Sequence, residues 1–123
     1  MKLEEIRDYC LSLPHATETV QWGNDLVFKV GGKMFTVCDL EGSKLSFKCT
    51  PDEFQELILV EGIRPADYVA RYHWITIEKA GALRTSELKR LIKDSYEMVV
   101  AKLPKKVREK LASGQGSAGL RPA

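Results

Sequence analysis

Residues 26–38 read LVFKVGGKMFTVC, and this stretch decides the fold. Two runs of β-branched and aromatic residues flank the pair Gly31 and Gly32. Glycine accepts the positive φ angles of a tight primed turn, so the pattern predicts a β-hairpin whose turn lies at these two residues.

The register of this hairpin follows from pairing its strands symmetrically about the two glycines. On one face, which is apolar, this pairing sets Phe28 opposite Phe35 and Leu26 opposite Val37. The other face then carries Val27, Lys29, Met34 and Thr36. Because a slip of one residue would turn the apolar set towards water, we expect the hairpin to start an antiparallel sheet.

The rest of the chain alternates between helical and strand periodicities. Apolar spacing predicts helices near residues 3–13, 50–61 and 85–99, and strands at residues 19–22, 45–49 and 74–78. Thr50 and Glu53 have the spacing of a capping box at the start of the second helix. A short turn or helix is expected from Arg64. This order predicts an α+β fold, a two-layer sandwich in which helices cover one face of an antiparallel sheet.

Length and composition indicate one globular domain. The chain has 123 residues, of which 44% are hydrophobic and 29% are charged. We expect a single domain over residues 1–111 and a flexible Gly/Ser-containing tail over residues 112–123. No apolar run approaches the roughly 20 residues of a membrane-spanning helix, and Glu4 and Glu5 stand where a signal peptide carries positive charge. The sequence therefore predicts a cytoplasmic protein that does not insert into membranes.

The residue types that carry metal or catalytic chemistry are scattered. Cys10, Cys38 and Cys49 are widely spaced and lie beside apolar residues, so we expect buried free thiols rather than disulfides or a zinc site. His15 and His73 have no carboxylate or thiol at a metal-ligand or nucleophile–base spacing. No phosphate-binding glycine motif is present. We expect no metal, no cofactor and no enzymatic activity.

The positive charge gathers in the C-terminal half. Residues 1–62 hold six Lys/Arg and eleven Asp/Glu, whereas residues 63–123 hold 13 and six. The densest run, residues 102–110, has five cations and one acid. Such a run either attracts phosphates or an acidic partner, or is a solvated helix end.

The outer face of the sheet is expected to be polar and cationic. If Ile75 and Ile77 point into the core, this face carries Lys29, Thr36, Ser46, Lys48, Trp74 and Thr76. Lysines with an aromatic ring and hydroxyls are typical of nucleic-acid surfaces, although an ordinary solvent-facing sheet has the same pattern. Tyr72, His73 and Trp74 form a polar-aromatic cluster beside Arg71. This cluster either lines a groove or is a hydrogen-bonded entrance to the sheet.

Five segments together resemble the MmcQ/YjbR family of small bacterial proteins. They are residues 26–35, 45–51, 62–66, 71–74 and 91–96, and the resemblance extends over about residues 1–102. It implies a CyaY-like sandwich and a DNA-binding protein with a double-wing arrangement of hairpins. The wings would be the hairpins at Gly31-Gly32 and Glu41-Gly42. The family has no catalytic motif that could be carried over.

Three functional hypotheses follow. The first is a non-enzymatic DNA-binding protein that contacts phosphates through Lys29, Lys33, Lys44 and Lys48, with Arg71, Lys105, Lys106 and Arg108 as auxiliary cations. The second is a protein-interaction or small-ligand module that uses a groove around Tyr72, His73 and Trp74. The third is an enzyme, which would need a perturbed titratable group in such a pocket. We expect a monomer or a weak homodimer.

Overall fold

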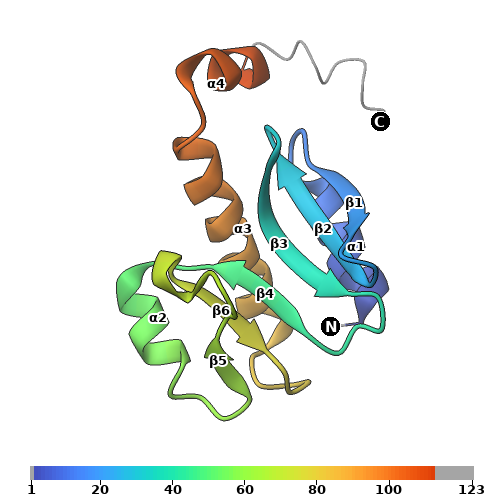
Figure 1. Ribbon diagram of the computed structural model, residues 1–123, viewed down its shortest axis with the longest axis vertical. Coiled ribbons are helices and arrows are strands. Elements are labelled where there is room, and N and C mark those ends of the chain that lie inside the picture. Colours follow the sequence, from blue (N-terminus) through green and yellow to red (C-terminus); the bar gives the residue numbers. More distant parts are fainter. Residues whose placement is uncertain (1, 113–123) are drawn as a thin grey trace.

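The protein is a two-layer α+β sandwich, as predicted. The structure, a computed structural model, describes residues 2–112 (Figure 1). Within them, six strands form one antiparallel sheet in the order β1-β2-β3-β4-β6-β5. The strands are β1 (Thr17–Gln21), β2 (Asp25–Val30), β3 (Lys33–Asp39), β4 (Leu45–Lys48), β5 (Ile63–Pro65) and β6 (Trp74–Ile77). The helices are α1 (Leu3–Ser12), α2 (Pro51–Leu57), α3 (Thr85–Ala101) and α4 (Lys105–Ala112), with a 3₁₀ turn at Ala70–Tyr72.

The helices α1, α2 and α3 bury their apolar sides against one face of the sheet, the core face. Ile6, Leu57 and Leu91 bring the three helices into a single cluster with the sheet residues Phe28 and Phe47. Ile75 and Ile77 belong to the same cluster, which confirms their predicted direction. The opposite face, the outer face, therefore carries Trp74 and Thr76.

A β-bulge in the central hairpin changes the predicted register. Beside the turn, Lys29 pairs with Met34 as symmetric pairing requires, but Phe28 then pairs with Thr36. Phe35 is the extra residue on β3, so two residues of one strand oppose one residue of the other. The predicted pairs Phe28–Phe35 and Leu26–Val37 are therefore wrong.

The bulge exchanges the faces of the residues that follow it. Leu26 pairs with Cys38 and Val27 pairs with Val37, so Cys38 and Thr36 face the core while Val37 turns to the outer face. Placing Thr36 on the outer face is thus a second error. Phe35 itself is fully buried and packs edge-on against Tyr96 of α3, with 5.3 Å between ring centroids.

Ser95 of α3 joins the bulge to the neighbouring strand. Its buried hydroxyl donates a hydrogen bond to the carbonyl oxygen of Phe35 at 2.7 Å. The hydroxyl oxygen of Ser95 in turn accepts a hydrogen bond from the backbone N–H of Lys48 at 3.0 Å. One side chain thus satisfies two backbone groups that the interrupted strand ladder leaves unpaired, as buried peptide groups require.

The remaining predictions have mixed outcomes. The capping box at Thr50 is confirmed, because its hydroxyl accepts from the N–H of Glu53 at 3.1 Å. The turn or helix expected from Arg64 is wrong at its start, since residues 63–65 form the edge strand β5 against β6. Ala112 ends α4. The rest of the predicted tail, residues 113–123, lies outside the described residues.

Replacing Ser95 by alanine tests the bridge between the bulge and β4. S95A leaves a buried carbonyl and a buried N–H without partners, so we expect the free energy of unfolding to fall by about 2–4 kcal/mol. Urea unfolding followed by circular dichroism measures this change. S12A is the matched control, because Ser12 is exposed and should change stability by less than about 0.5 kcal/mol. Equal stability of the two variants would contradict the structural role of Ser95.

The three cysteines are free and buried, as predicted, and they give a second test. Burial raises the pKa of each thiol from the ordinary value of 9.0 to about 12. At pH 8 the native thiolate fraction is then about a thousandfold below that of the unfolded chain, so a thiol reagent should label only unfolded protein.

The same pKa difference makes stability depend on pH. The folded state disfavours thiolates, so its advantage is complete below pH 9 and declines as the pH rises from 9 towards 12. The midpoint of urea unfolding should therefore be lower at pH 10 than at pH 7. Rapid labelling of all three thiols in the absence of urea would show that the thiols are accessible and would refute this account.

Candidate functional site

The turn of the β2–β3 hairpin lies near the junction between α3 and α4, towards one end of the molecule (Figure 1). Below them, β4 ends against α3, where the N–H of Lys48 bonds to Ser95. A Cβ atom at Gly31 would lie 2.6 Å from Cδ1 of Leu103 and 3.2 Å from Cγ1 of Val107. Gly31 is therefore needed both for its φ of 58° and because the hairpin turn packs directly on the start of α4.

This junction collects cations, and we call it the basic end. It comprises Lys29, Lys33, Lys48, Lys102, Lys105, Lys106 and Arg108. Burial, followed by repulsion from the nearby Lys102, lowers the pKa of Lys48. Among residues 2–112, Lys105 pairs with Glu109 at 3.8 Å, but Lys29, Lys33, Lys48, Lys102 and Lys106 form no ion pair.

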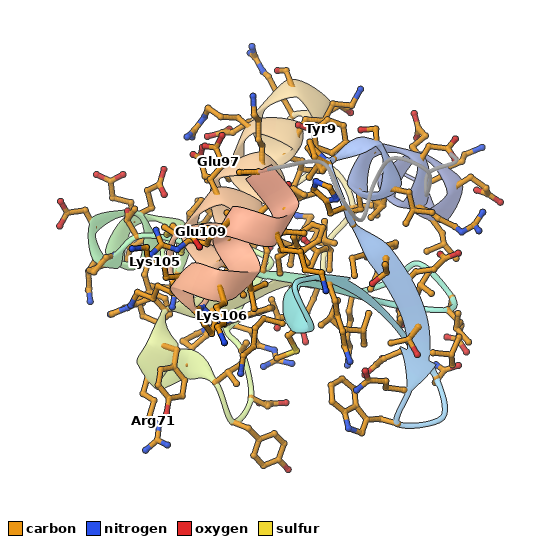
Figure 2. The ribbon with its side chains drawn as sticks, turned by 90° about the horizontal axis from the view of Figure 1, so that it is seen from above. Tyr9, Arg71, Glu97, Lys105, Lys106 and Glu109 are labelled. Carbon is orange, nitrogen blue, oxygen red and sulfur yellow. The ribbon has the colours of Figure 1, made fainter. Side chains whose placement is uncertain are left out.

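Two of the other predicted cations lie away from this end. Lys44 precedes β4 and Lys48 ends it, so about 13 Å of strand separates them. Lys44 is close enough to Asp39 to help lower the pKa of that carboxyl group. Arg71 stacks on the ring of Tyr72, with 4.9 Å from its guanidinium carbon to the ring centroid. Figure 2 shows Arg71 pointing outwards, well apart from Lys105 and Lys106 on α4.

The two turns proposed as wings also point in different directions. Because β2, β3 and β4 form a meander, the Gly31-Gly32 turn and the Glu41-Gly42 turn lie at opposite ends of the sheet (Figure 1). Only the Gly31-Gly32 turn belongs to the basic end.

The cluster Tyr72, His73 and Trp74 does not line a common groove. Tyr72 is half exposed under Arg71, and the ring of His73 packs edge-on against Phe54, with 5.6 Å between centroids. Trp74 is buried on the outer face of the sheet. Of the three residues, only Trp74 contributes to the cleft described next.

The outer face holds a cleft with a volume of about 520 Å³. Its floor is formed by sheet residues: Met34, Val37, Ser46, Trp74 and Thr76. The hydroxyl groups of Ser46 and Thr76 are 2.8 Å apart and hydrogen-bond to each other. The segment that follows β5 forms one wall, and the turn between β1 and β2 contributes Trp22. This volume lies within the range of small-molecule sites.

Two exposed aromatic residues stand at the cleft. Trp22 is 66% exposed and Tyr68 is fully exposed, and both residues lie at the cleft. Their φ angles are 53° and 67°, in the left-handed region that bulky residues rarely occupy. Each such conformation costs on the order of 1–3 kcal/mol, and strained residues of this kind concentrate at binding sites.

The charged residues that line the cleft are three acids, Asp25, Asp39 and Asp67, and two cations, Lys44 and Arg64. Asp25 and Asp39 are direct cross-strand partners on β2 and β3, an arrangement that places like charges side by side. Burial raises the pKa of Asp39, but hydrogen bonds from Ser43 and Lys44 outweigh it and lower that pKa overall.

Two other charged residues that line the cleft, Arg64 and Asp67, are hydrogen-bonded to each other. Arg64 donates hydrogen bonds to Glu78 at 2.7 Å and to Asp67 at 3.1 Å, so its positive charge is already compensated. Asp25 has no hydrogen-bond or ion-pair partner among residues 2–112.

Sequence reasoning missed this cleft. Its aromatic and acidic residues belong to turns and strand ends, where periodicity gives no signal. One signal was available in the sequence. Trp22 stands directly before the turn residues Gly23, Asn24 and Asp25, where a large aromatic ring has no strand to pack against. Within the described chain, no group of three or more His, Cys, Asp or Glu side chains could hold a metal ion. None of the helices over residues 2–112 is long and apolar enough to cross a membrane.

Known proteins resemble this chain over most of its length. The YjbR family model matches residues 11–98. The "Uncharacterized protein YjbR" of Escherichia coli K12 is 30% identical, with 90% of this chain and 98% of that protein covered. The "Uncharacterized protein YbdF" of E. coli O157:H7 is 27% identical, with 90% and 94% covered.

Solved structures share the fold. A Deinococcus radiodurans protein with a DUF419 domain superimposes with a TM-score of 0.81 at 30% identity, covering 90% of this chain and 88% of that chain. A Pseudomonas syringae protein gives a TM-score of 0.65 at 23% identity, with 80% and 98% covered, and shows the fold alone. Together with the family model and the identity to E. coli YjbR, these findings show that the chain belongs to the YjbR family.

Proposed function

We propose that this protein is a non-enzymatic DNA-binding protein that contacts phosphates through its basic end. One observation carries the proposal: five lysines from the β2–β3 hairpin, β4 and the α3–α4 junction lie at this end without an ion-pair partner among the described residues. Gathering like charges costs free energy, because each charge disfavours the charged form of its neighbours. A polyanion repays that cost, because its phosphates replace the missing acids and its counterions are released.

The distribution of charge also indicates which end of the molecule would contact DNA. The basic end and the acidic cleft lie towards opposite ends of β2 and β3, since Lys29 and Asp25 stand at opposite ends of β2. A phosphate backbone is attracted at the first and repelled at the second. We therefore assign the contact to Lys29, Lys33, Lys48, Lys102, Lys105, Lys106 and Arg108, and we leave out Lys44 and Arg71. The resemblance to MmcQ/YjbR proteins implies the same ligand.

A charge-matched pair of triple variants tests this proposal. K33Q/K102Q/K106Q removes three cations from the basic end, whereas K44Q/K79Q/K93Q removes three exposed cations elsewhere. We expect the first variant to bind random-sequence duplex DNA at least about tenfold more weakly than the second, because it loses phosphate contacts. The slope of log K against log salt should fall by about 2–3, close to 0.9 for each lost contact.

Fluorescence anisotropy of a labelled duplex across a salt series measures both quantities. Circular dichroism of each variant confirms that it is folded. Equal weakening in the two triple variants would mean that net charge alone attracts DNA. Absence of binding by the unmodified protein, even at low salt, would refute the DNA-binding function.

A further inference from the structure

We propose that the outer-face cleft binds a small organic cation, an ammonium or guanidinium group joined to a flat apolar body. This site is separate from the basic end and its ligand has the opposite charge. The cleft is an open cavity of about 520 Å³ in the only sheet face that α1, α2 and α3 leave uncovered within the described residues. Its residues supply three complementary features, namely a negative group, exposed rings and an apolar floor.

The negative group is the carboxylate of Asp25. Asp39, its cross-strand partner, is already held by Ser43 and Lys44, and Asp67 is held by Arg64. Asp25 is the lining carboxylate that lacks a partner among residues 2–112. A ligand cation beside Asp25 would give this carboxylate a partner through a charge-assisted hydrogen bond.

The rings are those of Trp22 and Tyr68. They come from separate turns, line the same cleft and are largely exposed to solvent. The face of an aromatic ring, and of tryptophan most strongly, attracts ammonium and guanidinium groups. Trp22 lies in the turn just before β2, which begins at Asp25. The ring and the unpaired carboxylate therefore stand close together and can both attract a cation.

The floor explains why the cation should carry an apolar body. Met34, Val37 and Trp74 present apolar surface on the outer face, and only the Ser46–Thr76 hydroxyl pair interrupts it. A simple metal ion would leave this surface in water, whereas a flat hydrocarbon group would cover it. Of the charged groups that line the cleft, Asp39 lies close to Lys44 and Arg64 to Asp67, so an anion would be repelled mainly by the unpartnered carboxylate of Asp25.

Three probes of one shape and different charge test the assignment: phenethylamine, phenylethanol and phenylacetate. We expect phenethylamine to bind most tightly and to shift the amide signals of Asp25 and Tyr68 and the indole signal of Trp22 in heteronuclear NMR spectra. Phenylethanol should bind about tenfold more weakly, since it lacks the charge-assisted contact, and phenylacetate should not bind.

Substitutions at Asp25 and at Trp22 measure separately what the carboxylate and the aromatic ring contribute to binding. D25N should weaken phenethylamine binding about tenfold and remove its advantage over phenylethanol. W22L keeps apolar bulk without a ring and should weaken phenethylamine about twofold to fivefold. D8N, an exposed acid on α1, is the matched control and should leave all affinities unchanged.

Several results would overturn the proposal. They are equal binding of the three probes, unchanged phenethylamine affinity in D25N, or no phenethylamine binding at millimolar concentrations. Shifts of the cleft signals on dilution of the protein alone would show that a second copy occupies the cleft, and would also overturn it. None of these results bears on DNA binding, whose lysines are unchanged in every variant.

Discussion

The hydroxyl group of Ser95 carries the interaction on which the arrangement of the sheet depends. It joins the carbonyl of Phe35, at the bulge of β3, to the N–H of Lys48, at the end of β4, and it does so from the middle of α3. A bulge interrupts a strand ladder and leaves backbone groups that must find partners elsewhere. Because α3 supplies that partner, both Phe35 and Thr36 can turn into the core without an unsatisfied carbonyl between them. The bulge also turns Val37 to the outer face, where it forms part of the floor of the cleft.

Much of the fold could be predicted from local sequence. The Gly31-Gly32 turn, the capping box at Thr50 and the inward direction of Ile75 and Ile77 each follow from residue types within a few positions of one another. The bulge could not be predicted in this way. Its unpaired carbonyl is satisfied by a residue 60 positions away, so its cost is visible only once α3 lies on the sheet. Symmetric pairing was therefore right beside the turn and wrong beyond Phe35.

The candidate sites were predictable to different degrees. The number of lysines in the sequence predicts a cationic surface. Which lysines lie close together in the fold depends on where the hairpin turns and helix ends are placed. The β2–β3 turn packs on the start of α4 because Gly31 contacts Leu103 and Val107. The β3–β4 turn lies at the opposite end of the sheet, as consecutive turns of a meander must, so Lys44 does not belong to the basic end. The cleft was harder still to predict from the sequence. Trp22, Asp25 and Tyr68 follow no common spacing in the sequence. They come together at the cleft because the segment that follows β5 forms one of its walls.

Like charges come close together at two places in the structure, with opposite sign. Exposed charges on a stable surface are interspersed, since like charges placed side by side are destabilising. Here Asp25 pairs with Asp39 on adjacent strands, whereas Lys48, at the end of β4, lies near Lys102 at the end of α3. Exchanging one partner in each pair would remove both repulsions without touching the core. Local conflicts that persist in an otherwise consistent fold are expected at functional or strained sites. Because the two pairs differ in sign and lie apart, the two ligands that we propose, one anionic and one cationic, would occupy separate sites.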